Sequence, residues 1–269
     1  MGMKELEISD DLLLECVNAA VKGANIAEEE KFTTDKSKKD DNTFVTEADK
    51  RAEKKIREEL NENTDYSIVG EEHGGNLDSD SYWLVDPIDG TQNYAYKQPL
   101  YGTAVALIED DNPVLGCFYM PELEYLFYAK EDNGAYLNND KIHVSELEDL
   151  TESYITLTGY NIPQNMTPIL ENINRWGQSF SCALQSECWV ANGWNDVCVA
   201  GKLHPWDLGT GTIMVREAGG VVKTLDGDDK WSSIKNGGTI MGNKNLVDLI
   251  IEELPEEIKN DILTGQFQK

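Results

Sequence analysis

The chain has 269 residues, of which 40% are hydrophobic and 9% aromatic, so it can bury a substantial core and is not expected to be disordered. Its 50 acidic and 23 basic side chains give a formal net charge of −27, which excludes nucleic acid and anionic membranes as expected partners. Without a membrane-spanning apolar run or the layout of a signal peptide, the sequence is typical of a cytoplasmic protein.

The acidic excess has two compatible explanations. Because the acids are spread along the chain, most of them are expected to form a solvated coat, while a few can still build a site for divalent cations. The five cysteines and three histidines show no spacing typical of a zinc site or a disulfide framework. We therefore expect the cysteines to lie in the core and the histidines to be structural or to face solvent.

Apolar periodicity predicts the first elements of the chain. Hydrophobic residues recur at helical spacing over 9–30, which predicts an amphipathic helix capped by Ser9. The charged stretch at 31–42 has no such periodicity and is predicted to be a mobile loop. Thr46 and Asp49 have the spacing of a capping box, so a second helix is expected to begin there.

After the second helix the pattern changes to short apolar runs bounded by turn residues, which predict strands. These runs lie at 66–69, 82–85, 103–108, 114–120, 124–129, 134–137, 154–158, 221–224 and 238–241. Helical patterns return at 166–175, 183–193, 207–218 and 245–253. Because helices and strands are mixed without a repeat or a linker, we predict one layered α+β domain over 1–269. Its N-terminal α+β part would end at about 145, and its C-terminal α/β part would begin at about 146.

The segment 83–94 carries the most informative pattern. An apolar strand delivers Asp86, Pro87 turns the chain, and Asp89 returns to the same side three residues later. The following glycine lets the backbone approach a ligand, and a helix that starts at Thr91 would direct free N–H groups at a phosphate. Taken alone, the segment is explained equally well by a turn whose carboxylates only hydrogen-bond the backbone and cap a helix.

Other acids at predicted element ends favour a functional site. Glu71 and Glu72 follow the preceding strand, and Asp207 stands at the start of a later helix. Carboxylates gathered without bases repel one another, so a cluster of these side chains with Asp86 and Asp89 needs cations. Hard oxygen ligands without histidine or thiolate favour Mg²⁺, Mn²⁺ or Ca²⁺ over zinc. For Glu72, exposure on the surface is the preferred interpretation.

These segments resemble the inositol monophosphatase family, which belongs to a superfamily of magnesium-dependent, lithium-sensitive sugar and inositol phosphatases that includes fructose-1,6-bisphosphatases. The matching segments are 83–96, the triplet Gly70-Glu71-Glu72, 45–49 and 206–220, in the order that the family has. The resemblance implies a layered αβαβα sandwich of the sugar phosphatase type. It also implies a homodimer that binds a small sugar or inositol phosphate.

The resemblance further implies roles for the matching residues, with two to three Mg²⁺ ions, or Mn²⁺, in each site. The implied metal ligands are Glu71, Asp86, the Ile88 carbonyl, Asp89, Asp207 and, with Glu71 at a weaker third ion, Asp49. Asp49 and Thr91 would position and help to deprotonate the attacking water, and Glu71 would take part in catalysis through its metal. The implied substrate-binding residues are Ile88, Asp89, Gly90, Thr91, Ser181, Cys182, Ala183 and Asp207, with the Gly90 and Thr91 amides receiving the phosphate.

Four further positions bear on this assignment. Gly209 and Thr210 stand where the family usually has alanine or a mixture of alanine and glycine, so the start of that helix is expected to be looser. Ala200 stands where animal inositol monophosphatases carry a glutamate that contacts inositol hydroxyls, which weakens the case for specific inositol recognition. Lys38 could cover the site as a lid, although a solvated loop lysine is the preferred interpretation.

The sequence therefore predicts a Mg²⁺-dependent hydrolase that releases phosphate from a small polyol or sugar phosphomonoester through an activated water. Inositol 1-phosphate is the nominal substrate. Fructose 1,6-bisphosphate is the nearest alternative, followed by a nucleotide substrate of the 3′(2′),5′-bisphosphate type. A relative that binds cations or a partner without turnover is the non-enzymatic alternative, and the intact acidic set disfavours it.

Overall fold

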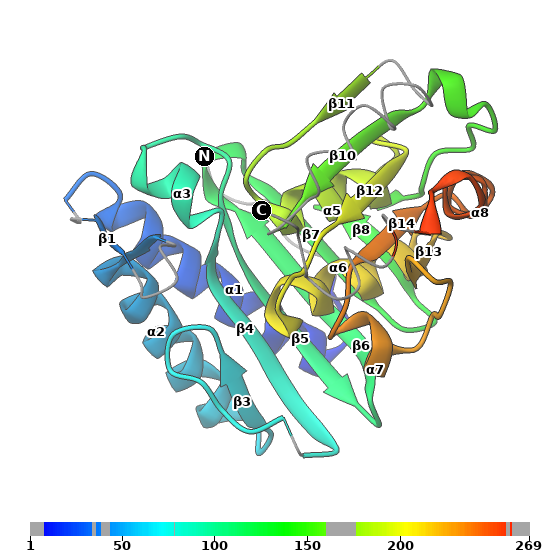
Figure 1. Ribbon diagram of the computed structural model, residues 1–269. Coiled ribbons are helices and arrows are strands. Elements are labelled where there is room, and N and C mark those ends of the chain that lie inside the picture. Colours follow the sequence, from blue (N-terminus) through cyan, green and yellow to red (C-terminus); the bar gives the residue numbers. More distant parts are fainter. Residues whose placement is uncertain are drawn as a thin grey trace.

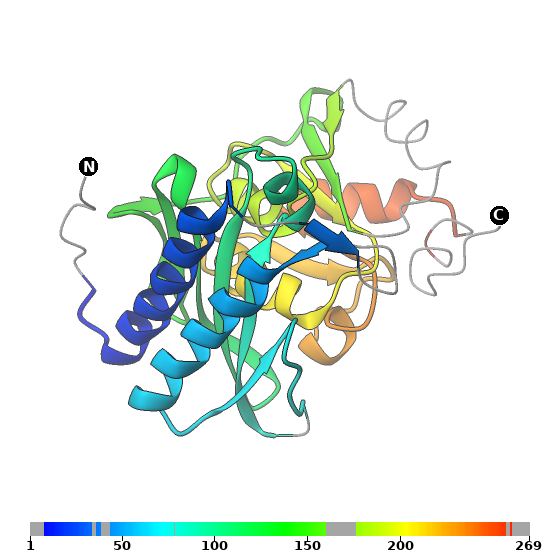
Figure 2. The same ribbon diagram turned by 90° about the vertical axis from the view of Figure 1, so that its left-hand side faces the viewer.

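Two long helices near the start of the chain cover one face of the larger sheet. The computed structural model describes residues 8–33, 36–38, 44–77, 79–159, 176–256 and 259. Helices α1 (Asp11–Glu30) and α2 (Glu47–Asn63) lie side by side (Figure 2) and bury alanine and aliphatic side chains against that sheet. Both helices fall where apolar periodicity predicts them, and the capping box at the start of α2 is present.

Two details of this region differ from the sequence prediction. Asp10 rather than Ser9 caps α1, because the Asp10 carboxylate accepts a hydrogen bond from the Leu13 N–H at 2.9 Å. The stretch predicted to be a mobile loop contains β1 (Lys36–Lys38), which pairs antiparallel with β2 (Phe44–Thr46). A strand of this length is too short to show a period in the sequence.

The larger sheet contains strands in the order β3-β4-β5-β6-β7-β8-β9. The first two, β3 (Ser67–Gly70) and β4 (Ser81–Asp89), run parallel, and each later pair of neighbours is antiparallel. The other strands are β5 (Gly102–Glu109), β6 (Asn112–Met120), β7 (Tyr125–Lys130), β8 (Gly134–Leu137) and β9 (Asp140–Ile142). Apart from β9, all of them occur at apolar runs that predict strands.

The smaller sheet contains strands in the order β11-β10-β12-β14-β13. Strand β10 pairs parallel with both of its neighbours, β11 and β12, whereas β14 pairs antiparallel with both of its neighbours, β12 and β13. The bounds are β10 (Tyr154–Thr158), β11 (Trp176–Gln178), β12 (Val197–Ala200), β13 (Val221–Thr224) and β14 (Thr239–Gly242). Sequence analysis missed β11 and β12, which are both short.

The alternation of side chains along the strands sets the order of the layers. Trp83 packs with α1 and α2, whereas its neighbour Leu84 packs with α5 (Ala183–Ala191) and α6 (Pro205–Glu217), which lie between the sheets (Figure 1). Helix α8 (Lys244–Glu253) covers the outer face of the smaller sheet. The order helix, sheet, helix, sheet, helix confirms the predicted αβαβα arrangement of the α+β class.

The remaining described elements are short. They are α3 (Thr91–Ala95), α7 (Trp231–Ile234) and 3₁₀ turns at Pro121–Leu123 and Leu150–Glu152. The predicted helix at 166–175 and the side chain of Lys38 lie outside the described residues. None of the helices in the described ranges is both long and apolar enough to cross a membrane. The two-part division at about residue 145 stays a prediction.

Candidate active site

A bulge near the end of β4 brings Asp86 and Asp89 to the same side of the sheet. In the pairing with β5, Asp86 lies opposite Ala104 and Asp89 lies opposite Gly102, so β4 advances three residues while β5 advances two. Side chains alternate along a strand, and one extra residue therefore returns Asp89 to the face that Asp86 occupies. Pro87 stands within this bulge, where a strand tolerates the missing N–H.

Asp207 reaches the same place from the first turn of α6. Its carboxylate accepts a hydrogen bond from the His204 N–H at 2.8 Å, which fixes the side chain at the start of the helix. Oxygens of Asp86, Asp89 and Asp207 lie within 4.8 Å of one another. All three residues are at most 9% exposed, so the structure brings together a buried carboxylate triad from distant parts of the chain.

Asp89 is held by the first turn of α5. Its two carboxylate oxygens accept hydrogen bonds from the Ala183 N–H at 3.1 Å and from the Leu184 N–H at 2.8 Å. The Cys182 thiol donates to the same carboxylate at 2.9 Å. Of the implied substrate-binding residues at 181–183, Cys182 and Ala183 therefore contact Asp89, whereas Ser181 is exposed. Their contact with substrate stays a prediction.

Glu71 lies near the triad but does not belong to the group of carboxylates whose oxygens lie within 4.8 Å of one another. It follows β3, is half-buried, and its backbone N–H donates to the Val85 carbonyl at 3.2 Å. The negative charge of Glu71 is one of the causes that raise the pKa values of Asp86 and Asp207. Glu72, which was expected on the surface, is half-buried as well, so that expectation was wrong in degree.

Asp49 and Thr91 meet beside the triad, as the family resemblance implies. One Asp49 oxygen accepts a hydrogen bond from the Thr46 N–H at 2.8 Å, and the other lies 3.4 Å from the Thr91 hydroxyl. The same hydroxyl lies closer to the Ile88 carbonyl, at 2.9 Å. Because a hydroxyl has one proton to donate, the shorter bond to Ile88 is the stronger one here.

The carboxyl groups of the site have strongly perturbed acidities. Burial, followed by the charges of Glu71 and Asp89, raises the pKa of Asp86 well above its usual range, and burial does the same for Asp207. Burial also raises the pKa of Asp89, although hydrogen bonds from Cys182 and Ala183 oppose the shift. For Asp49 burial raises the pKa to about 7. Without cations, burial and mutual repulsion therefore favour the protonated forms of these carboxyl groups.

Gly90 separates this cluster from the short helix α3. Its φ of 82° lies in the left-handed region, and a Cβ at this position would lie 2.8 Å from the Leu100 carbonyl oxygen. A side chain here is therefore excluded both by backbone conformation and by space. Gly90 and Thr91 begin α3 at the point where β4 delivers its two aspartates.

The two positions that depart from the family pattern on α6 pack closely rather than loosely. A Cβ on Gly209 would lie 2.9 Å from Leu84, so the glycine lets α6 approach β4. Thr210 is buried and its hydroxyl donates to the Val105 carbonyl at 3.3 Å. The expectation of a looser helix start was therefore wrong. Ala200 is fully buried at the end of β12, within the core between the sheets.

Glu187 is a buried acid that sequence analysis missed. It lies on α5 with no exposed surface, and among the described residues neither of its carboxyl oxygens has a hydrogen-bond partner. Burial, assisted by the charges of Asp89 and Asp207, raises the pKa of Glu187 well above its usual range. Oε2 lies 1.6 Å from where a Cβ of Gly211 would stand, so this glycine makes room for the acid. The one signal in the sequence was the place of Glu187 among apolar residues on the buried face of the predicted helix.

Comparison with known proteins gives a consistent family assignment. The model of the inositol monophosphatase family matches residues 11–259. A fructose-1,6-bisphosphatase/inositol-1-monophosphatase of Thermotoga maritima is 32% identical over 223 residues, covering 80% of this chain and 84% of the relative. A histidinol-phosphatase of Mycobacterium tuberculosis is 32% identical over 205 residues, covering 70% and 77%. A solved structure of an inositol monophosphatase of Thermotoga maritima superposes with a TM-score of 0.86 at 28% identity, covering 94% of this chain and 100% of that structure.

Replacing Gly90 with alanine is expected to destabilise the protein more than the same change at Gly219. Both glycines have positive φ, but Gly219 has open space where a Cβ would stand, whereas Gly90 does not. Left-handed strain alone costs about 1–2 kcal/mol, so G219A should lose about that much free energy of unfolding. G90A should lose more, because the Leu100 carbonyl must also move. Urea unfolding of both variants measures the difference, and equal losses would contradict the steric argument.

The pH dependence of stability should report the acidic cluster. The pKa of Asp49 is raised from 3.8 in the unfolded chain to about 7 in the folded protein. As the pH rises through this interval, the unfolded state loses its proton first, so the free energy of unfolding falls. We expect urea unfolding in a chelator to show this loss between about pH 4 and pH 7. In the variant D49N, the free energy of unfolding should fall less over the same pH interval.

Magnesium should reverse the same loss. Divalent cations bind the ionised carboxylates, and a ligand at a hundred times its dissociation constant stabilises the folded state by about 2.7 kcal/mol. The expected result is a Mg²⁺-dependent rise in the free energy of unfolding at pH 8 that is smaller at pH 5. A protein whose stability at pH 8 ignores Mg²⁺ would contradict a metal site at the triad.

Proposed function

Because this chain belongs to the inositol monophosphatase family of phosphatases, we propose that it is a Mg²⁺-dependent hydrolase of small polyol and sugar phosphomonoesters. The observation that carries the proposal is the buried triad of Asp86, Asp89 and Asp207, whose oxygens lie within 4.8 Å of one another. Three carboxylates can share such a space only if protons or cations neutralise them. Cations that replace these protons would neutralise the carboxylates at neutral pH and allow a negatively charged phosphate ester to bind.

The donor atoms fit Mg²⁺ rather than a softer ion. Carboxylate and carbonyl oxygens are hard ligands, and they favour Mg²⁺, Mn²⁺ or Ca²⁺. Cys182 brings a sulfur atom to the site, but burial raises the pKa of its thiol well above the usual range. A thiol that keeps its proton is a poor metal ligand. The presence of this cysteine therefore does not turn the site into a zinc site.

We assign the ions to two main positions and one weaker position. Asp86 would contribute to both main positions, with Glu71 and the Ile88 carbonyl at one, and Asp89 and Asp207 at the other. Asp49, with Glu71, would hold the weaker third ion. When bound, Mg²⁺ supplies positive charge that stabilises the entering and leaving oxygens of the phosphoryl transfer.

The chain itself positions the phosphate and handles the proton. The backbone N–H groups of Gly90 and Thr91 would receive the phosphate, because they begin α3 directly beside the two β4 aspartates. The Thr91 hydroxyl would orient the attacking water and pass its proton towards Asp49, 3.4 Å away. Without bound cations, burial raises the pKa of Asp49 to about 7, and positive charge nearby would favour the ionised form that accepts the proton. Coordination of the Ile88 carbonyl would compete with its bond from Thr91 and favour the bond to Asp49.

Among substrates we rank inositol 1-phosphate first and fructose 1,6-bisphosphate second. The Thermotoga maritima relative is named for both activities, which supports keeping both. Ala200 offers a buried methyl group where an inositol-contacting glutamate would stand, so the polyol is expected to be recognised loosely. The histidinol-phosphatase relative adds histidinol phosphate to the compounds worth testing. From the family resemblance we also propose a homodimer, which sedimentation would test.

The proposal is tested by phosphate release in Mg²⁺ from inositol 1-phosphate, fructose 1,6-bisphosphate, histidinol phosphate and 3′-phosphoadenosine 5′-phosphate. We expect release from the first two and the least from the nucleotide, and no release in excess chelator. Selective release from histidinol phosphate or the nucleotide would overturn the substrate ranking. No release from any compound would favour a relative that binds cations without turnover.

Thr91 provides a sharper test of the mechanism. T91A should lower kcat by roughly 10²–10⁴-fold, because the attacking water loses the hydroxyl that orients it and relays its proton. KM should change much less, since the backbone N–H groups that receive the phosphate remain. T91S keeps the hydroxyl and should retain most of the activity. If T91A raised KM and left kcat unchanged, the hydroxyl would have a binding role instead.

A further inference from the structure

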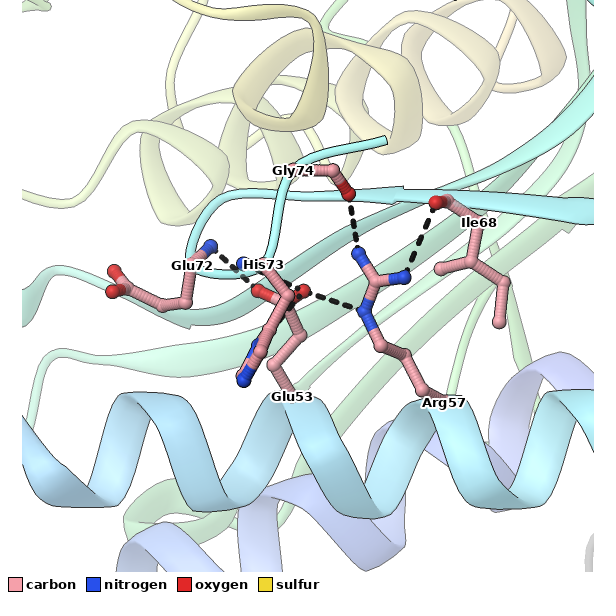
Figure 3. A network of polar contacts seen from close by, with 6 residues as sticks. All are labelled: Glu53, Arg57, Ile68, Glu72, His73 and Gly74. Carbon is pink, nitrogen blue, oxygen red and sulfur yellow. Dashed lines mark hydrogen bonds and ion pairs between the residues drawn. The ribbon is translucent and has the colours of Figure 1, made fainter. Parts of the chain in front are cut away.

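Glu53 is a fully buried acid on α2, one helical turn after Asp49. Its carboxylate accepts hydrogen bonds from the backbone N–H groups of Glu72 at 2.6 Å and His73 at 3.2 Å (Figure 3). Arg57, on the next turn of α2, donates from Nε to the same carboxylate at 2.7 Å. One carboxylate thus accepts three hydrogen bonds, two of them from the turn after β3, and His73 Nδ1 of the same turn also lies 3.3 Å from it.

Arg57 holds the same turn from the other side. Its guanidinium donates to the carbonyl of Ile68 at 3.3 Å, on β3, and to the carbonyl of Gly74, at the far end of the turn (Figure 3). The turn also closes on itself, because the Gly70 N–H donates to the Gly74 carbonyl at 3.1 Å. The pair of Glu53 and Arg57 therefore bridges α2 to β3 at Ile68 and to the second half of the segment 70–74.

The chain leaves room for this arrangement at Gly70. A Cβ at this position would lie 2.2 Å from a Glu53 carboxylate oxygen, so any side chain here would displace the carboxylate. Glu71 stands between Gly70, which packs on the Glu53 carboxylate, and Glu72, which hydrogen-bonds it. Its own N–H donates to the Val85 carbonyl, one residue before Asp86. The backbone of Glu71 is consequently fixed both to α2 and to β4.

We propose that Glu53, supported by Arg57, is a positioning residue that holds Glu71 against the repulsion of the acidic triad and thereby sets the affinity for divalent cations. This inference rests on the proposed function, in which Glu71 is a metal ligand. Four carboxylates repel one another, and a ligand carried by a turn moves away more easily than one fixed in a strand or a helix. Outer residues that orient metal ligands typically account for a 10–100-fold effect on metal affinity or activity.

The matched control is Glu59, a second buried acid on the same helix. It pairs with Lys22 of α1 and has no part in the turn at 70–74. E53Q and E59Q both remove one buried negative charge from α2, so both are expected to lower the melting temperature. Only E53Q should loosen Glu71, because glutamine offers a single, uncharged acceptor to three donors.

The experiment is titration of the full chain with Mn²⁺, in which electron paramagnetic resonance measures the free ion. We expect E53Q to bind Mn²⁺ roughly 10–100-fold more weakly than the wild type, and E59Q to bind it as tightly as the wild type. The Mg²⁺ concentration for half-maximal phosphate release should shift in parallel, with a smaller change of kcat at saturating Mg²⁺. If E53Q melts earlier but binds Mn²⁺ normally, Glu53 is only structural and the inference is wrong.

A second variant covers the case in which E53Q does not fold. R57M keeps the Glu53 carboxylate and its two backbone donors but removes the bridge to Ile68 and Gly74, so it should weaken Mn²⁺ binding severalfold. Unchanged binding in R57M would then overturn the inference. The proposed function fails separately: a wild type that binds Mn²⁺ but hydrolyses no phosphomonoester contradicts the activity and leaves the positioning role intact. A wild type that binds no Mn²⁺ contradicts both.

Discussion

The site depends on burying several carboxylates in one place with backbone N–H groups as their main partners. Asp49, Asp89 and Asp207 each accept from a backbone N–H in or next to the first turn of a different helix, namely α2, α5 and α6. The N-terminal end of a helix carries a partial positive charge, so three such ends at one point offset part of the repulsion. Burial nevertheless keeps the pKa values raised, which leaves the remaining compensation to cations.

The layered fold explains why these helix ends meet. α2 packs on one face of the larger sheet, whereas α5 and α6 pack on the other, and β4 passes between them. The bulge at Pro87 ends the regular pairing of β4 near this point and returns Asp89 to the face of Asp86, which points towards α5 and α6. Close contacts at Gly209 and Gly211 then let α6 approach β4 and α5. The site therefore lies where β4, α5 and α6 pack closely against one another.

Much of this arrangement could be predicted from the sequence, because it depends on local patterns of residues. The capping box of Thr46 and Asp49, the pair Asp86 and Asp89, and most strands of both sheets depend on residues close together in the chain. Contacts between distant segments could not be predicted in this way. The bond from Cys182 to Asp89 and the room that Gly211 makes for Glu187 depend on how α5 packs, which no spacing reveals. The short strands β1 and β12 were missed, and the three residues of β1 are too few to show a period.

Helix α2 connects the two halves of the proposed chemistry. Its first turn holds Asp49, which lies beside the Thr91 hydroxyl, and its next turn holds Glu53, which carries the turn of Glu71. An α-helix is rigid over such a distance, so a proton acceptor and a metal-binding turn fixed to it keep a constant separation. This linkage gives the buried charge of Glu53 a role beyond filling space, because its carboxylate accepts from the N–H groups of Glu72 and His73 and from Arg57, which an apolar side chain would leave without an acceptor.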